Sequence, residues 1–261
     1  MDINTNALAK RLTKLQSRNG GGSNIWFKAT EEKKVVRIVP YLHTDDNLPF
    51  FDVGYHYNVA GVRSLICPNI TFGDPCPICE LAEKFRMLGG TDNWNNFRKF
   101  QAKVRTYSPV IIRGEESEGV KLWGYGSTIA TALIQKFMSP DWGNLADPKT
   151  GRDIEVWSVP KGKSGNDTQF PQPMMDVKPN QTKLMSATEV KELLENMPDF
   201  LNDDTTFKTM TYDQLIELVA KLDSSYDDHE ENDFDDDQED PTSDSTTDLK
   251  TKLNSLLDED D

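Results

Sequence analysis

The chain has 261 residues, of which 36% are hydrophobic, and a formal net charge of -15 at pH 7. This length suits one large domain or two small ones, and the modest apolar content predicts that part of the chain stays outside any folded core. No apolar run reaches the roughly 18 residues of a membrane span, and residues 1–15 form a basic segment rather than a signal peptide, so we expect a soluble, intracellular protein.

The negative charge is unevenly distributed along the chain. Residues 223–261 contain 17 Asp and Glu but two Lys, whereas residues 1–222 contain 27 acidic and 27 basic residues. The body is therefore neutral, and its composition does not exclude a nucleic-acid partner.

A short basic helix is predicted near the N-terminus. Leu8, Leu12 and Leu15 recur at helical spacing, with basic side chains around the rest of the turn. The glycines at 20–22 interrupt this pattern and predict a flexible hinge. We interpret residues 1–22 as a movable arm that precedes the body.

The body, residues 23–222, changes to short β-rich runs separated by Gly, Pro, Asp and Asn. Strands are predicted at residues 35–39, 51–59, 62–66, 104–112, 120–125 and 154–159. Helices are predicted at residues 78–87, 128–137, 187–196 and 212–222. This order predicts a mainly β fold with some helix, as a small barrel or sandwich.

The last part of the chain, residues 223–261, is a predicted disordered tail. Its acidic run at 227–240 cannot bury enough apolar surface to fold alone. Leucines at helical spacing then follow a possible cap at Asp248 and form a candidate docking peptide for partner proteins. These leucines are Leu249, Leu253, Leu256 and Leu257.

The three cysteines of the chain, Cys67, Cys76 and Cys79, lie together, and His56 precedes them. Thiolate sulfur and imidazole nitrogen are the ligands that tetrahedral zinc prefers, and a Cys-x-x-Cys step lets two sulfurs reach one ion. The cluster predicts one structural Zn²⁺ in a reducing compartment rather than a disulfide framework. The alternatives are ordinary buried cysteines and, as a rival fourth ligand, His43.

Three Cys and one His fill a tetrahedron and leave no position for a reacting water, so we do not expect an enzyme. The CPIC run resembles half of the zinc deaminase signature, whose other half is His-x-Glu. Neither His56 nor His43 is followed by glutamate at that spacing. A metal-dependent hydrolase or deaminase is therefore the least favoured class.

Basic and aromatic residues interleave between residues 96 and 125. Bases of a single strand stack on aromatic faces while Lys and Arg follow the phosphates, so this mixture is typical of a sequence-tolerant groove. The alternative is an amphipathic strand pair with its aromatics in the core. The predicted phosphate contacts are Arg98, Lys99, Lys103, Arg105 and Lys121, the predicted stacking residues are Tyr107, Trp123 and Tyr125, and a second patch adds Lys161, Lys163 and Phe170.

The acidic tail favours the nucleic-acid interpretation. A polyanion tethered to a protein with a cationic groove competes with nucleic acid for that groove. Simple solubilisation is the alternative role of the tail.

This layout resembles the single-stranded DNA-binding proteins of T-even-type bacteriophages, the helix-destabilising proteins of phage replication. The likeness is strongest over residues 33–84, in the run VVRIVP and in the ligand set from His56 to the CPIC run that leads into a helix. It continues through TYSPVII and ESEGVKLWGYG to about residue 170, and it returns in the character of the tail.

The resemblance implies an oligonucleotide-binding (OB) barrel with an inserted zinc subdomain and a DNA cleft between them. It implies self-association along DNA through the arm, where the nearest equivalent of the basic cluster of the family is Lys10, Arg11, Thr13 and Lys14. It also implies that the tail binds replication and recombination proteins in the cytoplasm of an infected bacterium.

We therefore expect a sequence-nonspecific, cooperative protein that coats and protects single-stranded DNA in phage replication, recombination and repair. The alternative is a zinc-stabilised adaptor that binds proteins through its tail in phage transcription or replication. RNA and DNA are not distinguished by residue type.

Overall fold

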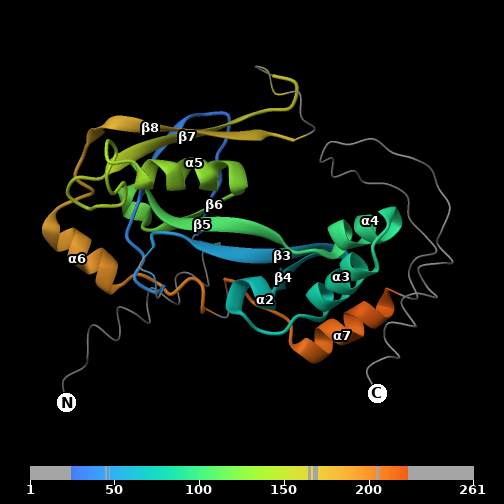
Figure 1. Ribbon diagram of the computed structural model, residues 1–261. Coiled ribbons are helices and arrows are strands. Elements are labelled where there is room, and N and C mark those ends of the chain that lie inside the picture. The colour runs from blue at the N-terminus through green and yellow to red at the C-terminus, as the bar shows by residue number, and fades with distance from the viewer. Residues whose placement is uncertain are drawn as a thin grey trace, which may run out of the picture. The chain divides into compact units, whose positions relative to one another are not determined.

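The computed structural model describes residues 25–44, 46, 48–163, 166, 170–203 and 206–222 (Figure 1). The predicted arm and tail lie outside these residues. The chain divides into two compact units, the first made of residues 1–51 and 106–198, the second of residues 52–105 and 199–261. From the sequence, residues 23–222 were predicted as one body.

Eight strands are assigned to one open sheet. They are β1 (Trp26–Phe27), β2 (Lys34–Ile38), β3 (Phe51–Val59), β4 (Val62–Cys67), β5 (Lys103–Ile112), β6 (Lys121–Tyr125), β7 (Arg152–Val159) and β8 (Gln172–Gln181). The first unit contains the order β1-β6-β5-β2-β7-β8, in which β1 and β6 are parallel and the other neighbours antiparallel. Among the described strands none joins β1 to β8, so the sheet does not close into the expected barrel.

The helices make the fold mixed α/β rather than mainly β. They are α2 (Pro68–Phe72), α3 (Pro77–Leu88), α4 (Thr91–Phe100), α5 (Ser127–Met138), α6 (Ala187–Glu195) and α7 (Tyr212–Lys221), with a 3₁₀ turn at Glu116–Glu118. In the described part of the chain no helix has both the length and the apolar character needed to span a bilayer.

The core of the first unit lies between its strands and α5 (Figure 1). Alternate residues of β2, β5 and β7 point inward because side chains of a strand alternate between its two faces. Val36, Val110 and Ile154 are all fully buried there. From α5, Ile129 and Leu133 reach this core, since residues four apart share one helix face.

A buried charge cluster lies in the first unit beside the end of β8. Arg37 has no solvent exposure, and its guanidinium donates to the Asp153 carboxylate at 3.1 Å and to the Thr182 hydroxyl at 2.9 Å. Arg113 donates to the same carboxylate at 2.9 Å and to the Leu184 carbonyl at 2.6 Å. Desolvation lowers the pKa of Arg37, and the charge of Asp153 opposes that shift. The two arginines hold the chain that leads from β8 to α6.

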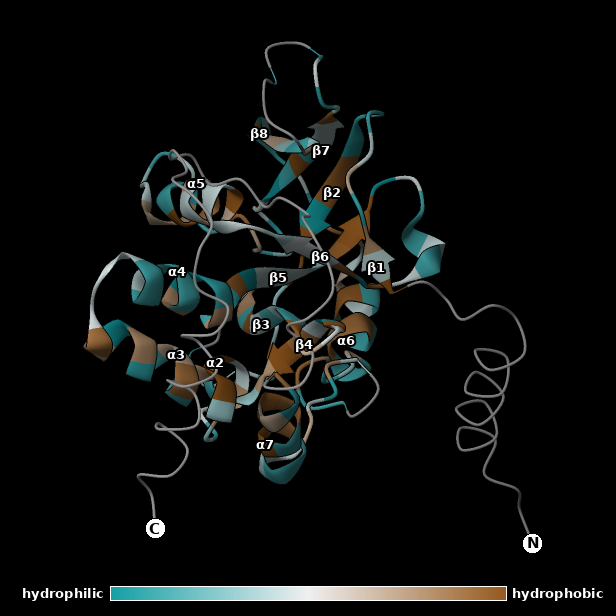
Figure 2. Ribbon diagram, turned by 90° about the vertical axis from the view of Figure 1, so that its right-hand side faces the viewer, coloured by the Kyte–Doolittle hydropathy of each residue, from teal (hydrophilic) through white to brown (hydrophobic). Residues whose placement is uncertain are grey.

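The second unit contains the β3–β4 hairpin and the helices α2, α3 and α4. It also contains α7, which comes from a later part of the sequence. One apolar cluster joins them, which includes Phe85 of α3 and Leu215 and Val219 of α7. Helix α7 has an apolar and a polar side (Figure 2), and a capping box of Thr211 and Gln214 satisfies its first backbone N–H groups. The metal-ligand candidates of the sequence lie in this unit.

The strands and helices predicted within the described residues are all present, with boundaries shifted by two residues or fewer, and the predicted arm helix lies outside those residues. β1, β8, α2 and α4 were not predicted from the sequence. β8 carries two prolines, and its polar and apolar residues do not alternate regularly as strand residues usually do. α4 is rich in Asn and basic residues, so its sequence does not show the apolar spacing by which the other helices were predicted.

Candidate metal centre and basic segment

The β3–β4 hairpin places two of the four predicted ligands on one face. Gly54 pairs with Cys67 and His56 pairs with Leu65, so His56 and Cys67 lie two positions apart on the same side of the ladder. Ala60 and Gly61, at φ 47° and 79°, form the tight turn that joins the strands. A hairpin with a short turn therefore fixes the register of these two ligands.

The other two ligands come from the start of α3. Cys76 occupies the N-cap position, Pro77 the first turn, and Cys79 the third helical position. Proline favours the first turn of a helix because its fixed φ suits that position and it has no N–H to satisfy. The helix dipole and free N–H groups of this end also favour negative sulfur.

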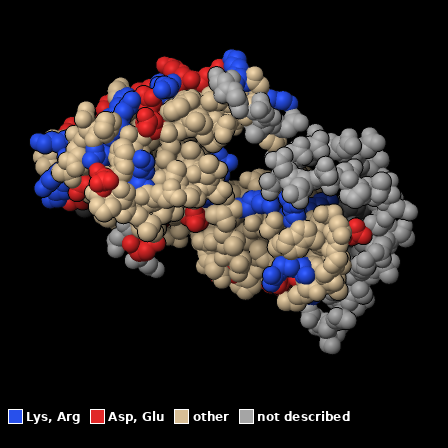
Figure 3. Space-filling model, turned by 45° about the horizontal axis from the view of Figure 1, so that its top comes forward, with Lys and Arg blue, Asp and Glu red and all other residues tan. Residues whose placement is uncertain are grey.

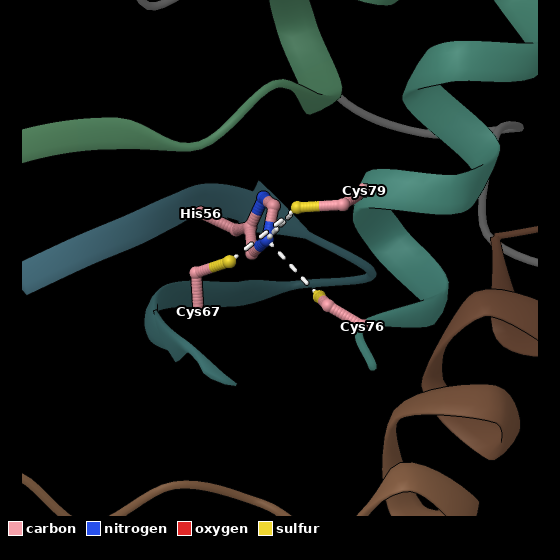
Figure 4. A group of neighbouring side chains, drawn as sticks. All are labelled: His56, Cys67, Cys76 and Cys79. Atoms are coloured by element: carbon pink, nitrogen blue, oxygen red, sulfur yellow. Dashed lines mark hydrogen bonds between the residues drawn. The ribbon is translucent and has the colours of Figure 1, made fainter. Parts of the chain in front are cut away.

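The four side chains point toward one another (Figure 4), and their ligand atoms all lie within 4.8 Å of each other. The Sγ atoms of Cys67 and Cys79 are 3.4 Å apart, and His56 Nε2 is 3.4 Å from Cys76 Sγ and 3.6 Å from Cys79 Sγ. Tetrahedral zinc, with bonds of about 2.3 Å to sulfur and about 2.0 Å to nitrogen, separates its ligand atoms by roughly 3.5–3.8 Å. The cluster can therefore hold one metal ion, as the sequence predicted.

The rival ligand His43 lies outside this cluster. It belongs to the first unit, where its Nε2 lies 3.0 Å from the Met197 carbonyl. The structure thus assigns the imidazole position to His56.

His56 has a second contact, on the other side of its ring. Its Nδ1 lies 2.7 Å from the Phe100 carbonyl, and the histidine is 1% exposed. A carbonyl oxygen can only accept, so Nδ1 carries the hydrogen and Nε2 presents its lone pair to the sulfurs. This is the tautomer that a metal ligand bound through Nε2 requires.

Hydrogen bonding within the cluster already favours negative sulfur. Contacts from Cys76 and Cys79 lower the pKa of Cys67 to about 3, and the same sharing of protons raises the pKa of Cys79. The backbone N–H of Ile70 also donates to Cys67 Sγ, at 3.5 Å. One thiolate is thus stabilised even before a cation replaces the remaining protons.

Gly54 provides space behind the hairpin, and its substitution makes a first testable prediction. A Cβ at this position would meet Ile70 Cβ at 2.5 Å and Cys67 Cβ at 3.0 Å, so Gly54→Ala must displace α2 or a metal ligand. We expect a loss of stability of about 1–3 kcal/mol in the second unit, together with weaker metal retention. Thermal melting and metal content measure both effects.

Gly126→Ala is the matched control for this substitution. Its backbone is extended, at φ -86°, and no neighbouring atom lies within 4 Å of the added carbon. Equal melting temperatures for the two variants would contradict the steric role of Gly54.

The predicted DNA contacts of the first unit are divided between its interior and its surface. Tyr107, Trp123 and Tyr125 are 6%, 3% and 2% exposed, which leaves little of their rings available for a base to stack on. Lys121 is also buried, with Nζ 3.0 Å from the Glu118 carboxylate. These four positions match the alternative in which the aromatics belong to the core. The remaining three, Lys161, Lys163 and Phe170, are exposed.

The predicted DNA contacts of the second unit are all on its surface. Arg98 and Lys99 end α4, Lys103 and Arg105 begin β5, and all four side chains are exposed. Figure 3 shows Lys and Arg on the surface of this unit. Between Asp92 and Glu115 the sequence contains no acidic residue. We call these four residues the basic segment.

One aromatic residue of this region was missed by the sequence analysis. Trp94 of α4 is 50% exposed and lies four residues before Arg98, on the same helix face. Its ring packs at 5.1 Å against that of Phe97. The spacing of Trp94 and Arg98 would have revealed the pair if residues 91–100 had been recognised as a helix.

The residues predicted for self-association, Lys10, Arg11, Thr13 and Lys14, lie outside the described residues. The same holds for the predicted docking leucines at 249, 253, 256 and 257.

No protein-family model and no curated protein matches the chain. Its function is therefore inferred from the residues themselves.

Proposed function

We propose that this protein binds single-stranded DNA without sequence preference and coats it during phage DNA replication, recombination and repair. The observation that carries the proposal is the exposed basic segment, Arg98, Lys99, Lys103 and Arg105, together with the exposed Trp94 four residues before it, in a stretch without acidic residues between Asp92 and Glu115. Cations that follow phosphates next to an aromatic ring that accepts any base are the two requirements of sequence-tolerant single-strand binding.

The proposed metal is one structural Zn²⁺. Three sulfurs and one imidazole nitrogen, largely buried, are a donor set that zinc prefers to harder or octahedral cations. When bound, the ion would link the β3–β4 hairpin to the start of α3. All four tetrahedral positions are then taken by protein, so the proposal includes no enzymatic activity.

We propose the exposed Trp94 as a base-stacking residue, a function that the sequence had assigned to Tyr107, Trp123 and Tyr125. Those three rings are buried, and the structure gives no support for base stacking on them. Lys161, Lys163 and Phe170 of the first unit remain proposed contacts.

The resemblance to the phage protein family supports the rest of the proposal. On that ground the first unit is an OB-type barrel left open, the arm mediates cooperative self-association, and the tail binds replication and recombination proteins. The place of action would be the cytoplasm of the infected bacterium.

The test is a titration of the full chain with poly(dT) at several salt concentrations. Each phosphate contact contributes about 0.7 to the slope of log affinity against log salt, so alanine at all four positions of the basic segment should lower the slope by roughly three. Affinity at low salt should fall as well. The slopes are measured by fluorescence anisotropy of labelled DNA.

The control removes the same number of cations elsewhere. Lys33, Lys34, Lys178 and Lys191 are not among the proposed contacts, and their fourfold alanine variant should keep the slope of the wild type. Affinity that stays constant from low to high salt would contradict the proposal.

A protein-protein adaptor remains the second candidate, and the burial of Tyr107, Trp123 and Tyr125 favours it, because it assigns those rings to the core. The same titration separates the two functions. Absence of poly(dT) binding at low salt would favour the adaptor, and a parallel titration with poly(U) compares RNA with DNA.

A further inference from the structure

The ring of His56 connects the metal centre to the end of α4. Its Nε2 faces the sulfurs of Cys76 and Cys79, while its Nδ1 donates to the carbonyl of Phe100, the last residue of α4. Phe100 is 1% exposed, and it separates Lys99 from Lys103 in the sequence. One buried imidazole thus contacts both the metal site and the backbone between Lys99 and Lys103 of the basic segment.

The Phe100 carbonyl needs this donor. The last carbonyls of a helix have no partner within the helix, and a buried carbonyl without a partner costs free energy. The contact also requires one tautomer, because only a ring with hydrogen on Nδ1 can donate to the carbonyl. A metal ion on Nε2 excludes the other tautomer, in which Nδ1 would face the carbonyl lone pair to lone pair.

We infer that His56 is a positioning residue through which the bound metal fixes the end of α4 and thereby the placement of Arg98, Lys99 and Lys103. The ring of Phe100 also stacks on Phe85 at 5.9 Å, and the N–H of the Phe100–Gln101 peptide group donates to the Phe97 carbonyl at 2.8 Å. The hydrogen bond from His56 holds the carbonyl side of this peptide group, and it is one of the two bonds that set the backbone direction at the end of α4. Its consequence for DNA rests on the proposed function, whereas the mechanical link does not.

Two variants remove the function of Nδ1 and keep the metal. His56→Cys keeps a zinc ligand at this position but removes the donor to Phe100. The double variant His56→Cys, Cys79→His also lacks this donor and keeps one imidazole among the four ligands. The hydrogen bond can thus be removed while zinc stays bound.

The experiment uses the full chain loaded with Zn²⁺. Tryptic cleavage after Arg98, Lys99 and Lys103 is mapped by mass spectrometry, and its rate reports how often the backbone at the end of α4 opens. Zinc content is measured in parallel. In His56→Cys we expect one bound zinc and cleavage at these bonds roughly tenfold faster than in the wild type, the effect of one lost buried hydrogen bond. Cleavage after Lys84 of α3 should keep its rate.

Cys79→His is the matched control, because it also exchanges a ligand but leaves the bond from His56 to Phe100. It should bind zinc and protect the three bonds as the wild type does. Zinc-loaded His56→Cys with wild-type cleavage rates would overturn the inference.

A second comparison applies if His56→Cys does not retain zinc. The double variant His56→Cys, Cys79→His keeps three sulfurs and one imidazole for zinc but has no donor to Phe100. We expect faster cleavage at the three bonds in the double variant than in Cys79→His alone, and equal rates in these two zinc-loaded proteins would overturn the inference. Failure of the wild type to bind poly(dT) would remove the proposed function and leave the cleavage result intact.

Discussion

Removal of the metal from zinc-loaded protein is expected to unfold the second unit and leave the first unit folded. Cys67 and Cys76, at 0% and 1% exposure, belong to the apolar cluster of the second unit, so the ion would lie inside its core. Structural zinc contributes about 10–16 kcal/mol of apparent binding free energy at pH 7, as much as the whole stability of a typical domain. Chelation should therefore abolish the melting transition of this unit.

Fluorescence distinguishes the two units. Of the five tryptophans, Trp94 belongs to the second unit, and the other four belong to the first. The difference between wild type and a Trp94→Phe variant reports on the second unit, and melting of the variant alone reports on the first. Chelator should remove the Trp94 transition and preserve the other.

Cys76→Ala should have the same effect as the chelator, because three ligands do not close the tetrahedron. Ser64→Ala, at an exposed position of the neighbouring hairpin, is its control and should melt as the wild type does. A metal-free protein in which both transitions keep their temperatures would show that no ion supports this core.

The metal cluster was predictable because its information is local in the sequence. The step from Cys76 to Cys79 brings two sulfurs together on one helix turn, and the neighbouring hairpin supplies Cys67 and His56. The predicted strands were found for a similar reason, since alternation of apolar residues marks a strand wherever it packs.

The direction of the aromatic side chains was not predictable in this way. Tyr107 and Trp123 look alike in sequence whether they face a core or solvent. In the folded first unit, β1 packs on both rings through Trp26 and Phe27, and Trp123 also joins the core that α5 covers. Trp94 was missed for the opposite reason, because a polar helix carries it at the surface.

The buried arginine cluster also could not be foreseen. Arg37 lies in an apolar run and looks like the exposed member of an alternating strand, whereas its partners Asp153 and Thr182 are far away in sequence. Only the folded chain brings Arg113 to the same carboxylate. A charged group inside a core is compatible with folding when such partners surround it.

Asp153→Ala is therefore expected to destabilise the first unit strongly. The substitution leaves Arg37, which has no solvent exposure, and Arg113 without their shared carboxylate. Removing one partner of a buried ion pair costs about 3–5 kcal/mol, because the remaining charge is buried without compensation. Urea unfolding followed by tryptophan fluorescence in the Trp94→Phe background measures this loss in the first unit alone.

Glu155→Ala is the matched control, two residues further along the same strand. Glu155 pairs with Lys33 and Lys178, whose side chains are 55% and 40% exposed, so water compensates both cations when the carboxylate is removed. A much smaller shift of the urea midpoint should follow. Equal midpoints for the two variants would mean that the Asp153 carboxylate does not hold the two arginines, and that the chain from β8 to α6 is anchored by packing instead.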